Sequence, residues 1–401
     1  MTKNIQVKAG FAESVYTRDI QLSSTLAVFM EAERLRAAGV DIVDFGAGEP
    51  DFATPQNIKA AAQRAIDENF TRYTPTGGTA QLKDAIIKMT ARDFGAAYKP
   101  SEVIVTVGGK QGIFNAMASV VNPGDEVLVP APYWVTFPEA ARFLRATPVF
   151  IDTHSSGFAL TADALRAAIT PRTRLLIINS PNNPTGRVIP PDEFRKIVET
   201  AAEHDIWVIS DECYVHFAYP PARAYSAASL PADLRPRVMV CGSFSKTYAM
   251  TGWRVGYSLG AEPWIRAMLK VQSHSTTSAS SVSQKAAVEA AISGQDSLRF
   301  MLAEYKRRRD WLIPALNEIP GIKCPMPEGA FYAFPDISAA FRGPVTNSAE
   351  MARFLLDEAR VAVTPGSAFG AEGYIRISYA TSLDALKKGV TRIAEALSRI
   401  S

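Results

Sequence analysis

Short runs of apolar residues alternate with longer helix-like segments from about residue 55 to residue 300. The runs are rich in valine and isoleucine and apolar on both faces, as expected for strands covered on both sides of a mostly parallel sheet. They span residues 102–109, 125–132, 147–153, 174–181, 206–212, 237–243 and 253–260. This pattern predicts an α/β fold with helices on both faces of a mixed sheet of about seven strands. Because only about ten residues separate the last two runs, we expect that pair to be antiparallel or specially connected.

The last hundred residues have a different pattern. A long amphipathic helix is predicted over 298–319, short strands over 330–337 and 374–381, and a final helix over 383–400. These elements indicate a smaller α+β domain. We expect the N-terminal helix and strand to pack with it, because they precede the α/β alternation. The predicted divisions are 1–50 for the N-terminal segment, 51–297 for the large domain and 298–401 for the small domain.

Composition and charge exclude several classes of protein. The 401 residues are 47% hydrophobic and 21% charged, as in an ordinary soluble globular protein. The net charge of +3 gives no concentrated basic face for nucleic acid. The densest basic run, 306–309, lies in a helical pattern and predicts a solvated helix face. No apolar run approaches the length of a membrane span.

The cysteines and histidines predict neither disulfides nor a metal site. Cys213, Cys241 and Cys324 lack C-x-x-C spacing, and the four histidines show no metal-ligand spacing. The N-terminus lacks the apolar segment of a signal peptide. We therefore expect a cytoplasmic protein in a reducing compartment.

Polar residues follow the ends of several predicted strands. In an open α/β sheet, ligands bind beyond the carboxyl ends of the strands. The residues in these positions are Gly109, Lys110, Trp134, Asn183, Asp211, Tyr214, Ser243 and Lys246. Their convergence predicts a ligand site at this edge of the sheet.

Lys246 lies in the stretch SFSKTYAMTGWRVGY, between two apolar runs. A lysine with little water around it has a lowered pKa, and its neutral amine reacts with carbonyls such as that of pyridoxal phosphate. A solvated loop lysine is the alternative, and this context alone leaves both open.

Three further features allow both a cofactor role and a structural one. Asp211 could hold the ring nitrogen of such a cofactor protonated, or it could be an ion pair or helix cap. Arg254, with Ser243 and Ser245, could bind a phosphate, or it could pair with an acid of the sheet edge. The stretch TVGGKQGIF, around Gly109, could bind phosphate at a helix N-terminus or form a tight turn.

Three other residues could face a ligand or serve the fold alone. Asn183 could reach into the cleft or belong only to a turn. Trp134 could stack on a planar cofactor or be a core aromatic. Arg376 is a lone charge in an apolar strand, and a substrate carboxylate is a plausible partner for it.

Together these motifs resemble the class I aminotransferases, which are pyridoxal-phosphate enzymes of fold type I. The motifs are SFSKTYAMTGWRVGY, NSPNNPTG, SDECY, APYW, GAGEPDF and YIRISYAT, and they keep the family's order and spacing from about residue 20 onward. The resemblance implies a fold-type I enzyme that uses pyridoxal 5'-phosphate. It also implies a homodimer with shared active sites.

The resemblance implies a role for each cofactor residue. Lys246 binds the cofactor covalently and then carries the proton, and Asp211 pairs with the pyridine nitrogen. The other residues implied to contact the cofactor are Tyr214 and Asn183 at the ring oxygen, Trp134 on the ring face, and Ser243, Arg254, the Gly109 and Lys110 amides and a partner's Tyr73 at the phosphate. Arg376, helped by the Gly48 amide, binds the substrate α-carboxylate.

The substrate is implied by the stretches VGGKQ, PYWVTFPE and SSTLAV, which resemble the bacterial aspartate aminotransferase branch. In that branch Lys110 and Thr25 would meet a side-chain carboxylate, which implies L-aspartate or L-glutamate with 2-oxoglutarate or oxaloacetate. Branch members often carry Lys-Pro where this chain has Gln21 and Leu22. That departure leaves open a broader aromatic or prephenate aminotransferase. A pyridoxal lyase and a non-catalytic relative are further alternatives.

Overall fold

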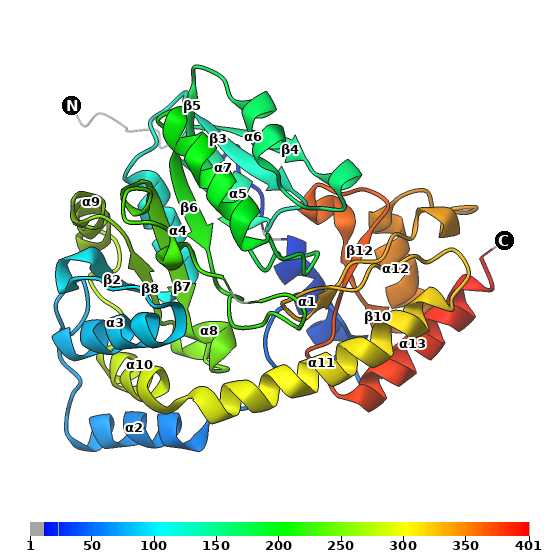
Figure 1. Ribbon diagram of the computed structural model, residues 1–401. Coiled ribbons are helices and arrows are strands. Elements are labelled where there is room, and N and C mark those ends of the chain that lie inside the picture. The colour runs from blue at the N-terminus through cyan, green and yellow to red at the C-terminus, as the bar shows by residue number, and fades with distance from the viewer. Residues whose placement is uncertain (1–11, 23, 224, 401) are drawn as a thin grey trace, which may run out of the picture.

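The computed structural model describes residues 12–22, 24–223 and 225–400, and its centre is a seven-stranded sheet (Figure 1). The strands are β2 (Val103–Thr106), β3 (Glu126–Ala131), β4 (Thr147–Asp152), β5 (Thr173–Asn179), β6 (Trp207–Asp211), β7 (Val238–Ser243) and β8 (Gly256–Leu259). Their order across the sheet is β2-β8-β7-β6-β5-β3-β4. Every predicted apolar run overlaps one of these strands, so the predicted α/β class is confirmed.

Strand β8 runs antiparallel to both of its neighbours, β2 and β7, whereas the other pairs are parallel. The expectation of an antiparallel last pair is therefore correct. The connection from β7 to β8 contains the short helix α8 (Phe244–Thr247), which carries Lys246. The apolar run 253–260 had suggested that Arg254 lies on this strand, but it does not. It precedes β8 in a left-handed turn, with φ of 55°.

Both faces of the sheet are covered by helices. Within β2, Val103 and Val105 belong to one apolar cluster and Ile104 to another, so side chains alternate between two buried faces. The helices on the Ile104 side are α4 (Gly108–Ala118), α5 (Thr136–Phe143) and α9 (Glu262–Ser273). Those on the opposite side are α2 (Gln56–Asp67), α3 (Ala80–Phe94), α6 (Ala162–Ala168), α7 (Pro191–Glu203) and α10 (Ser281–Ser293).

A second group of elements combines both ends of the chain (Figure 1). It consists of α1 (Ser24–Ala37), β1 (Val43–Asp44), α11 (Gln295–Asn317), β9 (Tyr332–Ala333), α12 (Ser348–Ala359), β10 (Val361–Ala362), β11 (Thr364–Pro365), β12 (Ile375–Ser378) and α13 (Leu383–Leu397). Strand β1 pairs in parallel with β10, and β12 lies between β11 and β9 in an antiparallel sheet. The exact domain boundaries stay a prediction.

The basic run in α11 forms a solvated face only in part, because Arg307 is exposed and Lys306 partly exposed, whereas the next two arginines are buried. Arg308 and Arg309 are only 5% and 6% exposed. Arg308 donates to the Asp51 carboxylate at 2.8 Å and to Glu304 at 2.9 Å. Buried guanidinium groups need such partners. The bond to Glu304 lies within α11, whereas the bond to Asp51 ties α11 to the segment that follows β1.

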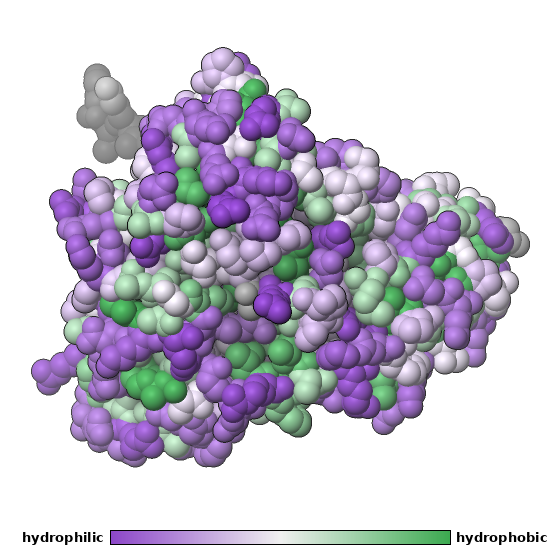
Figure 2. All heavy atoms as spheres, in the orientation of Figure 1, coloured by the Kyte–Doolittle hydropathy of each residue, from purple (hydrophilic) through white to green (hydrophobic). Residues whose placement is uncertain are grey.

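The outer surface is mostly hydrophilic. On the face shown in Figure 2, purple side chains predominate and apolar residues form only small patches. In the described ranges no helix combines the length and the apolar character needed to cross a membrane. The same residues contain no group of three or more histidine, cysteine or acidic side chains that could hold a metal ion.

Candidate functional site

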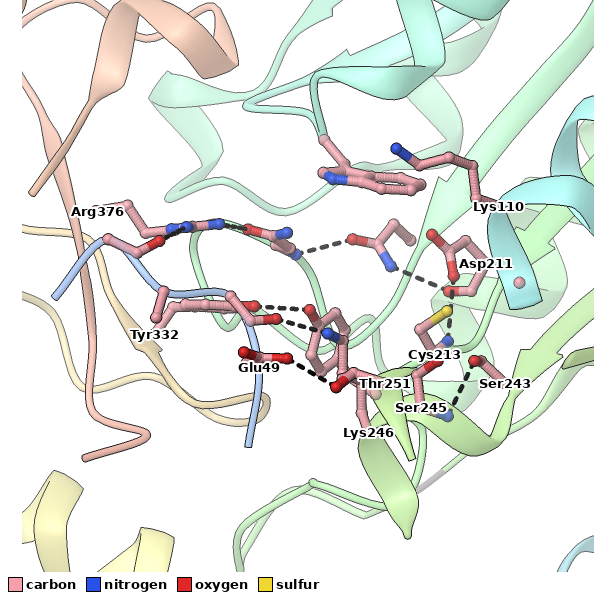
Figure 3. Close-up of a pocket in the computed structure, with 18 of the residues that line it drawn as sticks. Glu49, Lys110, Asp211, Cys213, Ser243, Ser245, Lys246, Thr251, Tyr332 and Arg376 are labelled. Atoms are coloured by element: carbon pink, nitrogen blue, oxygen red, sulfur yellow. Dashed lines mark hydrogen bonds between the residues drawn. The ribbon is translucent and has the colours of Figure 1, made fainter. Parts of the chain in front are cut away.

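A cavity of about 420 Å³ lies beyond the carboxyl ends of the central strands, between the large sheet and strands β9 and β12 (Figure 3). The predicted residues that line it are Gly48, Gly109, Lys110, Trp134, Asn183, Asp211, Tyr214, Ser243, Lys246, Arg254 and Arg376. Tyr73 is 93% exposed and does not line the cavity of its own chain. The side chain of Thr25 lies outside the described part of the structure. The fold thus gathers most of the predicted site in one place.

Lys246 projects from α8 into this cavity. Its Nζ donates a hydrogen bond to the Gly48 carbonyl oxygen at 2.5 Å. Burial lowers the pKa of Lys246 to about 8. A desolvated amine that loses its proton this readily is a good nucleophile toward a carbonyl.

Asp211 is the last residue of β6 and is 3% exposed. One carboxylate oxygen accepts a hydrogen bond from the Cys213 backbone N–H at 3.1 Å. Burial raises the pKa of Asp211 to about 6, while Cys213 and the charge of Lys246 act in the opposite direction. A carboxylate held at a strand end with so few partners can stabilise a cation placed in the cavity.

The start of α4 leaves its backbone open to the cavity. A Cβ on Gly109 would lie 3.0 Å from the Cys213 sulfur and 3.3 Å from the Ser243 Cβ, so a larger residue would not fit there without movement. Gly108 has φ of 75°, and a Cβ on it would lie 2.4 Å from a guanidinium nitrogen of Arg254. The first turn of an eleven-residue helix and a guanidinium therefore approach one another, an arrangement suited to phosphate.

A serine adds to the same cradle. Ser243 caps α8, and its Oγ accepts a hydrogen bond from the Ser245 backbone N–H at 3.1 Å. Arg254 is held by a bond from one guanidinium nitrogen to the Thr251 carbonyl oxygen at 2.8 Å. The hydroxyls and the guanidinium lie on the same side of the cavity as the start of α4.

Arg376 enters the cavity from the opposite side, from the middle of β12 (Figure 3). It is 2% exposed, and its described partners are uncharged oxygens, those of Asn183 at 3.0 Å, Gly46 at 2.8 Å and Thr364 at 3.4 Å. Its Nε is buried without a hydrogen-bond partner among the described residues. A buried guanidinium in this state is ready to bind a carboxylate.

Trp134 and Lys110 form the cavity's mouth. The Lys110 Nζ lies 5.0 Å from the centroid of the Trp134 ring. Burial lowers the pKa of Lys110, and the charge of Arg254 lowers it further. The mouth therefore offers an aromatic face and a cation.

Sequence reasoning missed several residues of the cavity wall. They are Glu49, Asn179, Cys213, Thr251 and Tyr332. Glu49 follows Gly48 in a motif already singled out, which could have indicated it. Tyr332 lies in a two-residue strand without a polar pattern, and only the pairing of β9 with β12 brings it here.

These features fit pyridoxal phosphate. The cavity volume is in the range of small-molecule sites. The α4 start, Ser243 and Arg254 suit its phosphate, Asp211 suits its ring nitrogen, and the Lys246 amine suits its aldehyde. No feature of the described cavity opposes this ligand.

Comparison with known proteins identifies the family. A model of the family "Aminotransferase class I and II" matches residues 40–393. The chain is similar to an aspartate aminotransferase of Bacillus sp. (strain YM-2), with 43% identity over 92% of this chain and 95% of that protein. It is 44% identical to an aspartate/prephenate aminotransferase of Cereibacter sphaeroides, over 93% of this chain and 96% of the relative.

A solved structure leads to the same family. The aspartate aminotransferase from Rhizobium meliloti matches with a TM-score of 0.93 and 41% identity, covering 98% of this chain and all of that one. The predicted fold type I, the aminotransferase activity and the cofactor are therefore confirmed. The chain belongs to the class I and II aminotransferases and is a pyridoxal-phosphate-dependent enzyme that exchanges amino groups between amino acids and 2-oxo acids.

Proposed function

We propose that this enzyme transfers the amino group of L-aspartate or L-glutamate to 2-oxoglutarate or oxaloacetate in a ping-pong sequence. The observation that carries the proposal is a pair of cations at opposite ends of one cavity, Arg376 inside and Lys110 at the mouth (Figure 3). A dicarboxylic amino acid would place one carboxylate at each. The charge of each carboxylate would then be matched as it leaves water.

Arg376 and the Gly48 amide would bind the α-carboxylate. The Arg376 guanidinium is already held by Asn183 and Gly46, so little side-chain freedom remains to be lost on binding. A guanidinium forks onto a carboxylate with two parallel bonds, which would fix the amino group near Lys246.

Lys246 would first bind the cofactor and later act as a base. The bound cofactor supplies an aldehyde for the amino group and a ring that withdraws electrons from the substrate's Cα. Once displaced by the substrate, the Lys246 amine would remove the Cα proton and return it on the cofactor side. The pKa of about 8 favours both proton removal and proton return near neutral pH.

The other residues would hold and tune the cofactor. Asp211 would keep the ring nitrogen protonated, and Tyr214 and Asn183 would bond the ring oxygen. Trp134 would stack on the ring face. The phosphate ligands we propose are Ser243, Arg254 and the backbone amides of Gly109 and Lys110.

We also propose a cytoplasmic homodimer. The 93% exposure of the Tyr73 side chain supports this, because a large aromatic placed so far out suits contact with a second subunit. There it would reach the partner's phosphate site. The three free cysteines are compatible with a reducing compartment.

A broader aminotransferase that accepts aromatic or prephenate-like substrates is the second candidate. A neighbouring cavity of about 770 Å³ supports it, because that cavity shares Lys110 and Arg254 with the site and is lined by Phe114, Tyr133 and Phe143. A ring on the substrate could extend into this space. The Cereibacter sphaeroides relative is itself named for aspartate and prephenate.

The deciding experiment compares kcat/KM for aspartate, glutamate, alanine, tyrosine and prephenate with suitable partners. In Lys110→Ala we expect the ratio of aspartate to tyrosine to fall about tenfold, since one partly exposed ionic contact is lost. Lys285→Ala is the matched control, because the Lys285 Nζ also lies over an aromatic ring, 4.8 Å from the Phe70 centroid, but outside the cavity. An unchanged ratio in Lys110→Ala would remove this residue from the substrate pocket.

A further inference from the structure

Two tyrosine hydroxyls meet inside the cavity, one from each side of the molecule. The Tyr214 oxygen lies 2.7 Å from the Tyr332 oxygen, a hydrogen bond in which either could donate. Tyr332 is completely buried and Tyr214 is 5% exposed. Both line the cavity with Lys246. The bond therefore joins β9 to the turn that follows β6.

The surroundings favour Tyr332 as the donor. Burial raises the pKa of both phenols, so both are protonated near neutral pH and only one hydrogen can lie between them. The Arg376 guanidinium lies 4.5 Å from the centroid of the Tyr332 ring. This nearby cation makes the Tyr332 hydroxyl the more acidic and thus the better donor. The other charged or titratable groups facing the pair are Cys213 and Glu49.

We propose that Tyr332 is a positioning residue that donates its hydrogen to Tyr214, so that the Tyr214 hydrogen points to the cofactor's ring oxygen. The inference rests on the proposed contact between Tyr214 and that oxygen. Hydrogen bonds in series polarise one another, so a donor behind Tyr214 strengthens the bond that Tyr214 makes. Arg376 would thus act on the cofactor through Tyr332 as well as on the substrate.

The consequence has a definite sign. With the cofactor bound, the nitrogen linking it to Lys246 would carry a titratable proton beside the ring oxygen, and loss of that proton would leave negative charge on this oxygen. A donor to this oxygen stabilises the deprotonated form and lowers the pKa. Removing the Tyr332 hydroxyl should therefore raise the pH midpoint at which the visible absorbance of the bound cofactor changes.

The test is a pH titration of that absorbance in the holoenzyme. Tyr332→Phe keeps the ring and removes only the hydroxyl, and we expect an upward shift of roughly half a pH unit. Tyr214→Phe should shift the midpoint further in the same direction. In the double variant the Tyr332 change should add nothing, because its effect passes through Tyr214. Tyr332→3-fluorotyrosine, a stronger donor, should shift the midpoint downward.

Tyr379→Phe is the control for loss of a buried hydroxyl. Tyr379 is also completely buried, but its hydroxyl donates to the Ala330 carbonyl oxygen at 3.2 Å and does not line the cavity. The Tyr379→Phe variant should therefore have the same absorbance midpoint as the wild type. If the wild type titrates but Tyr332→Phe has the same midpoint, this inference is overturned and the proposed function is not. A wild type with no titratable cofactor band would instead overturn the proposed role of Lys246, and this inference with it.

Discussion

The two sides of the cavity are built differently. One side, which we call the strand-end floor, comprises Asn183, Asp211, Tyr214, Ser243 and Lys246, all placed at or after the ends of strands of the large sheet. The other side, the small-strand wall, comprises Gly48, Tyr332 and Arg376, from the loop after β1 and from strands β9 and β12. The floor is fixed by one continuous sheet. The wall exists only where segments from both ends of the chain pair.

Three hydrogen bonds join the floor to the wall. They link Lys246 to Gly48, Tyr214 to Tyr332 and Asn183 to Arg376. The floor holds the groups that suit a cofactor, and the wall holds the guanidinium that suits a substrate. If this division is correct, floor variants should weaken cofactor binding, whereas wall variants should leave the cofactor bound. On the wall, Arg376 variants should alter substrate affinity, and Tyr332 variants should shift only the pH midpoint of the cofactor's absorbance.

The largest effect is expected on the floor, from Lys246→Ala. Removing both the covalent attachment and the proton carrier should lower kcat by at least ~10⁴-fold. The visible absorbance band of the bound cofactor should also be lost. Steady-state kinetics and an absorbance spectrum of the purified variant measure the two losses.

Lys83→Ala tests whether the loss of any partly buried lysine lowers kcat or removes the absorbance band. Burial also lowers the pKa of Lys83, whose Nζ donates to the Pro100 carbonyl oxygen at 3.1 Å, but it does not line the cavity. Its replacement should leave both kcat and the absorbance band unchanged. Retention of the band in Lys246→Ala would contradict the assignment of the floor.

On the wall, Arg376→Lys should have the next largest effect. Lysine keeps the charge but cannot fork onto a carboxylate, so kcat/KM should fall about 10²-fold for every substrate. The loss should appear mainly in KM, because the contact is made in the bound ground state as well. The absorbance band should remain, which separates this variant from Lys246→Ala.

Arg309→Lys is the matched control for a buried arginine. Arg309 is 6% exposed and donates to the Pro327 carbonyl oxygen at 3.0 Å, away from the cavity. The Arg309→Lys variant should have a lower melting temperature and an unchanged KM. An equal rise of KM in both variants would mean that Arg376 acts through stability alone.

The floor could be predicted from the sequence, and the wall only in part. Strands of the large sheet are long apolar runs, so Asp211 and Ser243 are recognisable as the residues that end them. Strand β9 has two residues, too few for any periodicity, so Tyr332 carried no signal. Arg376 stood out because it is a charge within an apolar strand.

The contacts of the wall with the floor depend on tertiary pairing alone. The bond between Tyr214 and Tyr332 joins residues 118 positions apart. The left-handed turn at Arg254 could not be predicted for another reason. The predicted strand 253–260 included Arg254, so the sequence did not show that β8 begins only after this residue. The burial of Arg308 required knowing where Asp51 lies after folding.

The smallest effect is expected on the pH dependence of stability, from two adjacent carboxylates, Asp211 on the floor and Glu212 behind it. Burial raises the pKa of Asp211 from 3.8 to about 6. The folded protein therefore binds more protons than the unfolded chain between these values, and stability falls as pH rises from about 4 to 6. Without cofactor, Asp211→Asn should be more stable than the wild type above pH 6, by roughly 1–3 kcal/mol.

Glu212→Gln sharpens this comparison, because burial also raises the pKa of Glu212, to about 7. The Glu212 carboxylate accepts hydrogen bonds from Ser210 and the Ala227 N–H and does not line the cavity. Both variants should flatten the pH dependence of unfolding measured on the cofactor-free protein. Adding pyridoxal phosphate should then stabilise the wild type and Glu212→Gln equally, and Asp211→Asn less, since only Asp211 would meet the ring nitrogen. Equal stabilisation of all three would place the cofactor's cation elsewhere and break the division between floor and wall.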